Sequence, residues 1–380
     1  MDCKFITNGV AIDYSGLIKP CCIFKPDATY AQHNHIQQVD LAVWHQTQPI
    51  QQLKNTLAAG QWPESCKSCK DIEQQGRGDS MRLNGLNSYG AFDSQDITLE
   101  IRPGNVCNFA CQTCWPAASS RVTQFYKQAD MDFVPVVTSS WDYRSILPLR
   151  DRIKNVVILG GEPFYDKSCL ALLEWMNEQQ FQCDITMFTN GSTVKRSWLE
   201  NYQGRITLVF SIDAVGTPGE YIRFGSAWAD VEQNYQYCKT LPNVNLRINV
   251  TTSFYNYLYL DHVMAWIIKQ GWPEVVSFGR AETLKDLRFF SETVIPTQSR
   301  PAVLAQVARA RQRVDDAVIE PMQKSNALAT LDSIVHNLAQ DNFDAAKHQD
   351  VCNFIKSMDQ VKHVRLRDYC PDLADTLLIN

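Results

Sequence analysis

Residues 97–116 read ITLEIRPGNVCNFACQTCWP, and they join a β-branched run to three crowded cysteines. The run ITLEIRP has the composition of a strand, because β-branched side chains favour extended backbone. The loop that follows carries Cys107, Cys111 and Cys114 within eight residues. In α/β barrels, the loops after the strands hold the functional groups. This stretch therefore predicts the first strand of a parallel sheet, with the cysteine loop at its functional end.

Five more short apolar runs follow along the chain: NVVILGG, CDITMFTNG, ITLVFSIDA, NVNLRINVT and EVVSFGRA. Helical patterns separate them, for example KSCLALLEWMNEQQ (167–180) and LYLDHVMAWIIKQ (258–270). Strands that alternate with helices predict a parallel sheet built from βα units, here six of them. Gly, Asn, Asp or Thr stands at or near the end of the five later runs, and these residue types are expected at functional loops.

The segments on either side of this core differ from it in composition and periodicity. Residues 1–90 are rich in Asn, Gln, Gly and Cys and have few long apolar runs, so a metal staple would help them to fold. Residues 291–380 show helix periodicity in RPAVLAQVARARQRVDDAVI and NALATLDSIVHNLAQD. We therefore predict a small metal-binding module (1–90), an α/β core (91–290) and a helical C-terminal extension (291–380).

The composition narrows the class of protein. The 380 residues carry a net charge of −5 and no basic footprint for nucleic acid. The N-terminus lacks a signal-peptide pattern, and no apolar run approaches the roughly 18 residues of a membrane span, so we expect a cytoplasmic protein. Thiols stay reduced in that compartment. Five of the thirteen cysteines are solitary and are interpreted as buried small hydrophobic residues: Cys169, Cys183, Cys238, Cys352 and Cys370.

The C-x3-C-x2-C spacing of the loop admits two kinds of metal site. Structural zinc requires four ligands, usually from paired C-x2-C units, and no partner pair follows nearby. A [4Fe–4S] cluster normally takes four thiolates, so three would leave one iron open to a substrate. A nucleophile would need one cysteine only. We favour a cluster on Cys107, Cys111 and Cys114, and zinc is the alternative.

CNFACQTC (107–114) resembles the signature of the radical S-adenosylmethionine (radical SAM) enzymes. The resemblance implies a partial (βα)6 TIM-like barrel, a [4Fe–4S] cluster on the three cysteines, and SAM bound at the fourth iron. It implies an oxidoreductase-like enzyme that reductively cleaves SAM to a 5′-deoxyadenosyl radical, which abstracts hydrogen from a substrate. It further implies an electron donor such as flavodoxin or ferredoxin. The family commonly has an aromatic residue before the third cysteine, where this chain has Thr113, flanked by Phe109 and Trp115.

LGGEP (159–163) is similar to the family's GGEP motif. The similarity implies that Gly160, Gly161, Glu162 and Pro163 contact the amino group of SAM. Gly and Pro are also ordinary turn residues, so a plain strand-to-helix turn is the alternative. The position of the motif, one βα unit after the cysteine loop, favours the SAM-binding interpretation.

Three later segments complete the implied SAM site. VFSIDAVG (209–216) resembles the end of the family's fourth strand, which implies that Ser211 reaches SAM and Asp213 reaches the ribose or the substrate; helix capping is the alternative. YIRFGSAW (221–228) resembles the next stretch, which implies that Arg223 grips the SAM carboxylate. Asn249 lies with Arg247 and Thr251 on one face of LRINVTT by strand alternation.

The first ninety residues resemble the SPASM/twitch module, which binds an auxiliary cluster. Cys3 is followed by Gly16, and Gly16 by four residues and Cys21; Cys66 and Cys69 form a later C-x2-C pair. The resemblance implies a second, fully ligated [4Fe–4S] cluster on these four cysteines. The module usually follows the barrel, whereas here it precedes it. Cys22 is a fallback ligand, and zinc bound by the same four cysteines is the alternative.

Together these features predict a radical SAM enzyme with an auxiliary cluster that modifies a peptide or protein. Oxidation or rearrangement of a small metabolite or nucleoside is the second interpretation, because no leader-peptide recognition domain is evident. A non-catalytic binding protein stabilised by zinc or a cluster is the third. We expect no nucleic-acid and no membrane partner. One role open to the C-terminal helices is to cap the barrel mouth.

Overall fold

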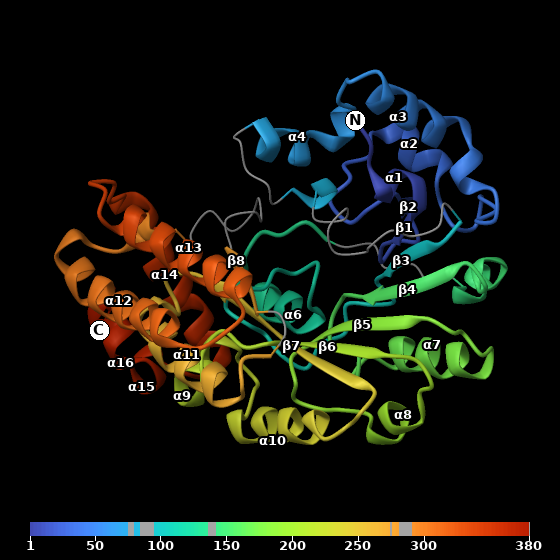
Figure 1. The fold of residues 1–380 in the computed structure, drawn as a ribbon. Helices are drawn as coiled ribbons and strands as arrows, with labels where there is room; N and C mark the ends of the chain where they lie inside the picture. The colour runs from blue at the N-terminus through green and yellow to red at the C-terminus, as the bar shows by residue number, and fades with distance from the viewer. Residues whose placement is uncertain (75–79, 84–94, 136–141, 274–275, 281–290, 380) are drawn as a thin grey trace. The chain divides into compact units, whose positions relative to one another are not determined.

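The computed structural model describes residues 1–74, 80–83, 95–135, 142–273, 276–280 and 291–379. The chain divides into two compact units (Figure 1). Unit 1 comprises Met1–Asn105, Val136–Met187 and Ser197–Ile206, and unit 2 comprises Val106–Pro135, Phe188–Arg196 and Thr207–Asn380. The predicted division into three consecutive parts stays a prediction.

Unit 1 is built on a mostly parallel sheet in the order β2-β1-β3-β4-β5. Its strands are β1 (Gly9–Ile12), β2 (Ile18–Lys19), β3 (Ile97–Ile101), β4 (Ile153–Ile158) and β5 (Asp184–Thr189), whose last two residues fall in unit 2. β1 pairs antiparallel with β2 but parallel with β3, and β3, β4 and β5 are parallel. The N-terminal segment therefore extends the sheet of the predicted core by one strand and a short hairpin arm.

The helices of unit 1 are mostly short, and several are single 3-10 turns. In chain order they are α1 (Lys4–Asn8), α2 (Ala28–His33), η1 (Trp44–Gln46), α3 (Gln48–Ala58), η2 (Glu64–Cys66), α4 (Lys67–Gln74), η3 (Tyr143–Leu149), α7 (Lys167–Glu178) and α8 (Arg196–Asn201). The longest, α7, begins where Asp166 accepts a hydrogen bond from the Ser168 amide at 2.8 Å, which caps its first turn. It buries Leu172, Leu173 and Met176, which spaces the apolar side chains at the helical period.

Unit 2 contains β6 (Ile206–Ser211, of which Ile206 falls in unit 1), β7 (Val244–Thr252) and β8 (Val276–Arg280), in that order. β7 and β8 pair in parallel. The accompanying helices are α6 (Ser120–Gln128), α9 (Gly216–Ile222), α10 (Trp228–Lys239), η4 (Tyr257–Tyr259) and α11 (Leu260–Lys269). α11 is the most thoroughly buried of these, because Leu260, Val263, Met264 and Ile267 repeat on one face.

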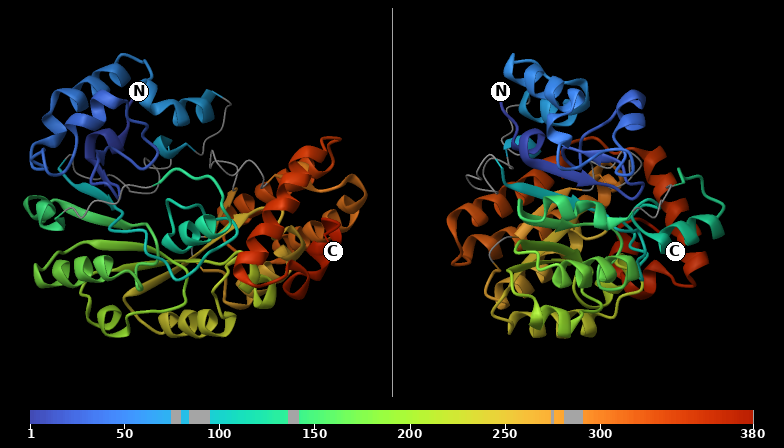
Figure 2. Two further views of the ribbon diagram at one scale, coloured as in Figure 1. Left: turned by 180° about the vertical axis from the view of Figure 1, so that it is seen from behind. Right: turned by 90° about the vertical axis from the view of Figure 1, so that its right-hand side faces the viewer.

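The C-terminal part of unit 2 is helical, as predicted. Its elements are η6 (Glu292–Val294), η7 (Thr297–Ser299), α12 (Arg300–Asp316), α13 (Pro321–Leu338), α14 (Ala345–Lys362), α15 (Leu366–Tyr369) and α16 (Pro371–Thr376). The left view of Figure 2 shows these helices, in orange and red, gathered into one group. Arg313 of α12 pairs with Asp261 of α11 at 2.5 Å, which joins the extension to a βα helix.

The predicted fold class is confirmed: the protein is α/β, with a mostly parallel sheet and a helical C-terminal region. Each of the six predicted strands is present, and of the last run residues 274, 275 and 281 lie outside the described part of the chain. The five solitary cysteines are all buried, as expected for small hydrophobic residues. Among the described helices, none combines the length and the apolar character that a membrane span requires.

Candidate functional site

In unit 2, the cysteine loop pairs with the chain that leaves α9. The Ala110 amide donates to the Phe224 carbonyl oxygen at 2.8 Å, and the Gln112 amide donates to the Ile222 carbonyl oxygen at 2.7 Å. These two bonds stand on either side of Cys111. Two backbone hydrogen bonds therefore hold the loop against the chain around Arg223, and no pattern in the sequence predicts this contact.

Arg223 lies between the two residues that receive those bonds, so it stands opposite Cys111. Its Nη1 donates to Asp213 Oδ2 at 2.8 Å, and its Nε is buried without a hydrogen-bond partner among the described residues. Burial opposes the charge of Arg223, but Cys111 and Asp213 together raise its pKa above the usual value. A charged guanidinium with an unsatisfied donor is suited to a carboxylate ligand.

Asp213 is fully buried and holds several elements in place. Besides Arg223, its Oδ1 accepts the Thr251 amide at 2.8 Å, and its carbonyl oxygen accepts Asn256 Nδ2 at 2.9 Å. The carboxylate thus connects the end of β6, the end of β7 and the chain after α9. This geometry identifies Asp213 as a structural partner of Arg223, whereas the helix-cap interpretation finds no support, since the described N-cap of α9 is Val215.

Asn190 lies close to the cysteine loop, although the sequence alone does not single it out. Its Nδ2 lies 3.8 Å from Cys107 Sγ and donates to Asn108 Oδ1 at 2.9 Å. Asn108 in turn donates to Ser192 Oγ at 2.9 Å. The available signal is the FTNG segment (188–191) at the end of β5, which fits a common Asn-Gly turn equally well.

The remaining residues of the loop have different surroundings. Phe109 is 1% exposed and packs in the core, whereas Trp115 is half-buried, so of the two only Trp115 keeps an accessible face. Burial raises the pKa of both Cys111 and Cys114, and the thiolates of Cys111 and Cys107 raise that of Cys114 further. Thiolates crowded in this way favour a bound cation, because the cation offsets their mutual repulsion.

Ser211 and Asn249 lie at the ends of neighbouring strands in unit 2. Ser211 is the last residue of β6 and is half-buried. The Asn249 carbonyl oxygen accepts the Ile212 amide at 2.9 Å, and its side-chain Nδ2 donates to Thr251 Oγ1 at 3.4 Å. The contact between the Asn249 and Thr251 side chains places both on one face of β7, as the alternation along the strand predicts. The Nε of Arg247 is buried with no partner within the described residues.

The GGEP segment lies in unit 1, after β4. Gly160 has φ of +136°, and a Cβ placed on it would lie 2.4 Å from the Gly104 carbonyl oxygen. The same oxygen accepts the Gly161 amide at 3.2 Å. The two glycines therefore allow the loops after β3 and β4 to touch through backbone alone.

The last two residues of this motif are buried. Glu162 is 0% exposed, and its Oε1 accepts the Phe164 amide at 3.3 Å. Pro163 is also buried. A carboxylate held inside the protein is unusual for a plain surface turn, where Glu is nearly always exposed. The placement of Glu162 thus agrees with a functional motif.

The four predicted auxiliary cysteines come together in unit 1. Cys3, Cys21, Cys66 and Cys69 line one pocket, with Arg82 and apolar side chains around them. Cys22 is not among the lining residues and instead interacts with Glu100. The choice of Cys21 over Cys22 as a ligand stays a prediction. Within the described residues, no three Cys, His, Asp or Glu side chains are already at the spacing of a formed metal site.

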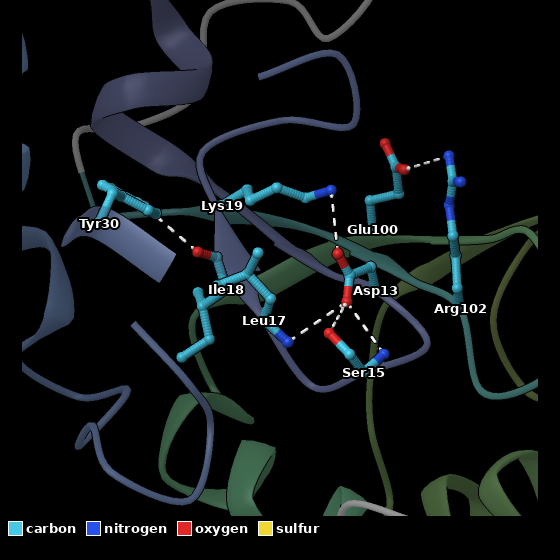
Figure 3. Close-up of polar contacts among 8 residues, drawn as sticks. All are labelled: Asp13, Ser15, Leu17, Ile18, Lys19, Tyr30, Glu100 and Arg102. Atoms are coloured by element: carbon cyan, nitrogen blue, oxygen red, sulfur yellow. Dashed lines mark hydrogen bonds and ion pairs between the residues drawn. The ribbon is translucent and has the colours of Figure 1, made fainter. Parts of the chain in front are cut away.

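Gly16, the glycine of the C-x(9–15)-G-x4-C pattern, makes the turn that delivers Cys21. It has φ of +85°, and its amide donates to the Asp13 carbonyl oxygen at 2.9 Å. Figure 3 shows the Asp13 carboxylate closing this turn, where it accepts the Ser15 amide at 3.0 Å and the Leu17 amide at 3.3 Å. Lys19 pairs with it at 3.2 Å, which fixes the strand that leads to the cysteine.

The polar residues near this module are paired with one another. Glu100 and Arg102 form an ion pair at 3.5 Å (Figure 3). Arg82 pairs with Glu73 at 2.5 Å and also faces the Cys3 and Cys69 thiols electrostatically. Burial raises the pKa of Cys66 to about 12. A guanidinium beside buried thiols is the charge that a thiolate site requires.

No family model and no curated protein matches the chain. Solved structures do match it. A structure of anSMEcpe with bound AdoMet is 15% identical, with a TM-score of 0.36 over 48% of this chain and 52% of that chain. Streptococcus suis SuiB bound to S-adenosylmethionine is 15% identical, with a TM-score of 0.36 over 81% and 66%. SuiB bound to the precursor peptide SuiA is 17% identical, with a TM-score of 0.37 over 74% and 63%. The chain thus spans about half to two thirds of the solved chains it matches.

Proposed function

We propose that the chain is a radical SAM enzyme, in which Cys107, Cys111 and Cys114 hold a [4Fe–4S] cluster. The observation that carries the proposal is the pairing of the cysteine loop with the chain after α9, which sets Arg223 opposite Cys111. Three thiols and a guanidinium with a buried, unsatisfied Nε supply what a cluster and the SAM carboxylate need. When bound, the cluster supplies the electron that cleaves SAM to a 5′-deoxyadenosyl radical.

In this proposal the chain's own residues bind SAM and orient the cluster ligands. Arg223 binds the SAM carboxylate, and Asp213 holds the guanidinium at the correct angle through its 2.8 Å contact. Asn190 donates toward Cys107 Sγ, which orients that ligand. Ser211 and Asn249 offer hydrogen bonds from the ends of β6 and β7. Gly160, Gly161, Glu162 and Pro163 bind the SAM amino group.

We further propose that Cys3, Cys21, Cys66 and Cys69 hold a second, auxiliary [4Fe–4S] cluster. The pocket that they line fits such a group by its donor set, four thiols and a nearby arginine. Zinc needs the same four thiolates, so the metal has to be measured. A fully ligated cluster would relay electrons or accept one from a substrate radical.

The proposed substrate is a peptide or protein, because enzymes of the SPASM/twitch class that the N-terminal module resembles mostly modify peptides. Oxidation or rearrangement of a small metabolite or nucleoside is the second candidate. A flavodoxin or ferredoxin is the proposed electron donor.

Anaerobic incubation with SAM and dithionite tests the proposed reaction. We expect 5′-deoxyadenosine from the wild type and none from the Cys107/Cys111/Cys114→Ala variant. The Arg223→Gln variant should keep its iron but bind SAM at least tenfold more weakly in equilibrium dialysis. A wild type that holds zinc in the loop and forms no 5′-deoxyadenosine would favour the non-catalytic binding protein.

A further inference from the structure

Lys362, the last residue of α14, reaches the cysteine loop from the C-terminal extension. Its Nζ donates to the Ala110 carbonyl oxygen at 3.0 Å and to Gln112 Oε1 at 3.1 Å. The side chain is only 7% exposed. Burying an ammonium group is costly unless it is paired, so a lysine in this position requires an explanation.

Aromatic rings and a second cation complete the surroundings of this ammonium. Lys362 Nζ lies 5.1 Å from the ring centroid of Phe224 and 5.9 Å from that of Phe125. The Arg121 guanidinium lies over the same two rings, at 5.7 and 6.0 Å, and donates to the Asn108 carbonyl oxygen. Two cations therefore hold alternate carbonyl groups of the cysteine loop.

The end of α14 is fixed, so Lys362 cannot easily turn away. Asp359, one turn earlier, accepts the Tyr221 hydroxyl at 2.7 Å and the Leu366 amide at 2.7 Å. Tyr221 belongs to α9, which leads directly into Arg223. The helix that carries the lysine and the segment that carries the arginine are thus tied together by Asp359.

The charge of Lys362 faces the cluster thiols. Burial lowers the pKa of Lys362 to about 8, while Cys111, Asp359 and Cys114 oppose that shift. In the reverse direction, Lys362 stabilises the thiolate form of Cys111. A positive charge in a dry site acts at a longer range than one in water, and it favours whichever state of a neighbouring group is more negative.

We propose that Lys362 is a positioning residue for the cluster loop, and that its charge makes the cluster held by Cys107, Cys111 and Cys114 easier to reduce. The inference rests on the proposed function, since it assumes a cluster in that loop. In this inference the C-terminal extension takes part in electron transfer, which differs from the predicted role of capping the barrel mouth. One electron from an external donor enters the cluster in this step, and no other bond changes.

The test is an EPR-monitored redox titration of the full-length, cluster-loaded protein. The variants are Lys362→Gln, Lys362→Arg and, as the matched control, Lys356→Gln, which removes an exposed lysine from the same helix. The signal of the loop cluster is recognised by its change when SAM is added. At a fixed potential we expect the ratio of reduced to oxidised cluster to fall about tenfold in Lys362→Gln, a shift of 59 mV for one electron. Lys362→Arg and Lys356→Gln should stay near the wild type.

The iron content and the potential of the Lys362 variants together test the inference. Iron lost from Lys362→Gln but kept in Lys362→Arg would also support a role for the positive charge in holding the loop. An unchanged potential in Lys362→Gln with full iron content would overturn the inference and leave the proposed function standing. Iron lost equally from both Lys362 variants would also overturn it, since the charge would not be the cause. A wild type without a loop cluster would instead refute the proposed function itself.

Discussion

At the scale of single residues, Asp213 and Arg223 form the most consequential pair in unit 2. Asp213 is fully buried, and it joins the guanidinium to the backbone of β7. Breaking such a pair leaves a buried charge unpaired, which costs far more than breaking a surface pair. The resemblance alone implied that Asp213 touches the ribose or the substrate, whereas the structure adds a role in holding Arg223.

We predict that Asp213→Asn destabilises the protein by about 3 kcal/mol, because Arg223 loses its partner in a nearly dry site. The matched control is Asp375→Asn, which breaks an exposed pair with Arg367 of similar length, 2.7 Å; it should cost less than about 1 kcal/mol. Urea unfolding of preparations with equal iron content measures both. Equal losses for the two variants would contradict the assignment.

His45 provides a prediction about pH in unit 1. Burial lowers the pKa of His45 from 6.5 to about 4, although its contact with the Gly9 carbonyl oxygen, 3.0 Å from Nε2, opposes the shift. Because the pKa of His45 is higher in the unfolded chain, the imidazole is protonated there at a higher pH than in the folded protein. Neutral His45 therefore contributes fully to the free energy of unfolding above pH 6.5. The folded state loses roughly 3 kcal/mol of this free energy as the pH falls from 6.5 to 4.

The slope of unfolding free energy against pH tests this prediction. His45→Gln can still donate to Gly9, and it should be clearly less sensitive to pH between 6.5 and 4 than the wild type. His33→Gln, at an exposed position of α2, is the control and should keep the wild-type slope. The same slope in all three proteins would show that His45 is not the titrating group.

At the scale of elements, the loops after β3 and β4 meet through glycine. We predict that Gly160→Ala costs about 3 kcal/mol or more, because a Cβ would meet the Gly104 carbonyl oxygen at 2.4 Å. Gly271→Ala is the control: its φ is also positive, +86°, but its Cβ would meet nothing within 4 Å. It should cost about 1 kcal/mol. Thermal unfolding that shifts equally in both variants would argue against the close approach.

The elements that could be predicted from the sequence are those with a run of residues long enough to show a strand or helix pattern. Each of the six core strands is a run of five or more residues with β-branched side chains, so their places were predictable. β1 and β2 were missed, because GVAI and IK are too short to show a period. Asn190 could not be singled out from the sequence, because Asn-Gly also makes ordinary turns.

Contacts between distant parts of the chain could not be predicted from local patterns. Lys362 is separated from Gln112 by 250 positions. It continues the buried stripe of Val351, Ile355 and Met358, but that spacing does not show which groups its ammonium contacts. The hydrogen bonds from the cysteine loop to Ile222 and Phe224 likewise join parts of the chain that are far apart in the sequence. The motifs predict which cysteines are ligands, and only the fold shows which side chains lie around those cysteines.

At the scale of the whole molecule, each compact unit carries one cysteine set. Cys3, Cys21, Cys66 and Cys69 line a pocket in unit 1, and Cys107, Cys111 and Cys114 share one loop in unit 2. The two sets are built from separate segments with separate supports, Gly16 and Asp13 in one and Arg223 and Lys362 in the other. Loss of one cluster should therefore leave the other in place.

The most direct measurement is the iron and sulfide content of anaerobically prepared protein. We expect about eight irons and eight sulfides per wild-type chain, and about four of each in the Cys107/Cys111/Cys114→Ala variant and in the Cys3/Cys21/Cys66/Cys69→Ala variant. Four irons with one zinc in the wild type would leave the loop cluster but make the N-terminal site structural. Zinc at both sites, with no iron in the wild type, would contradict the central claim.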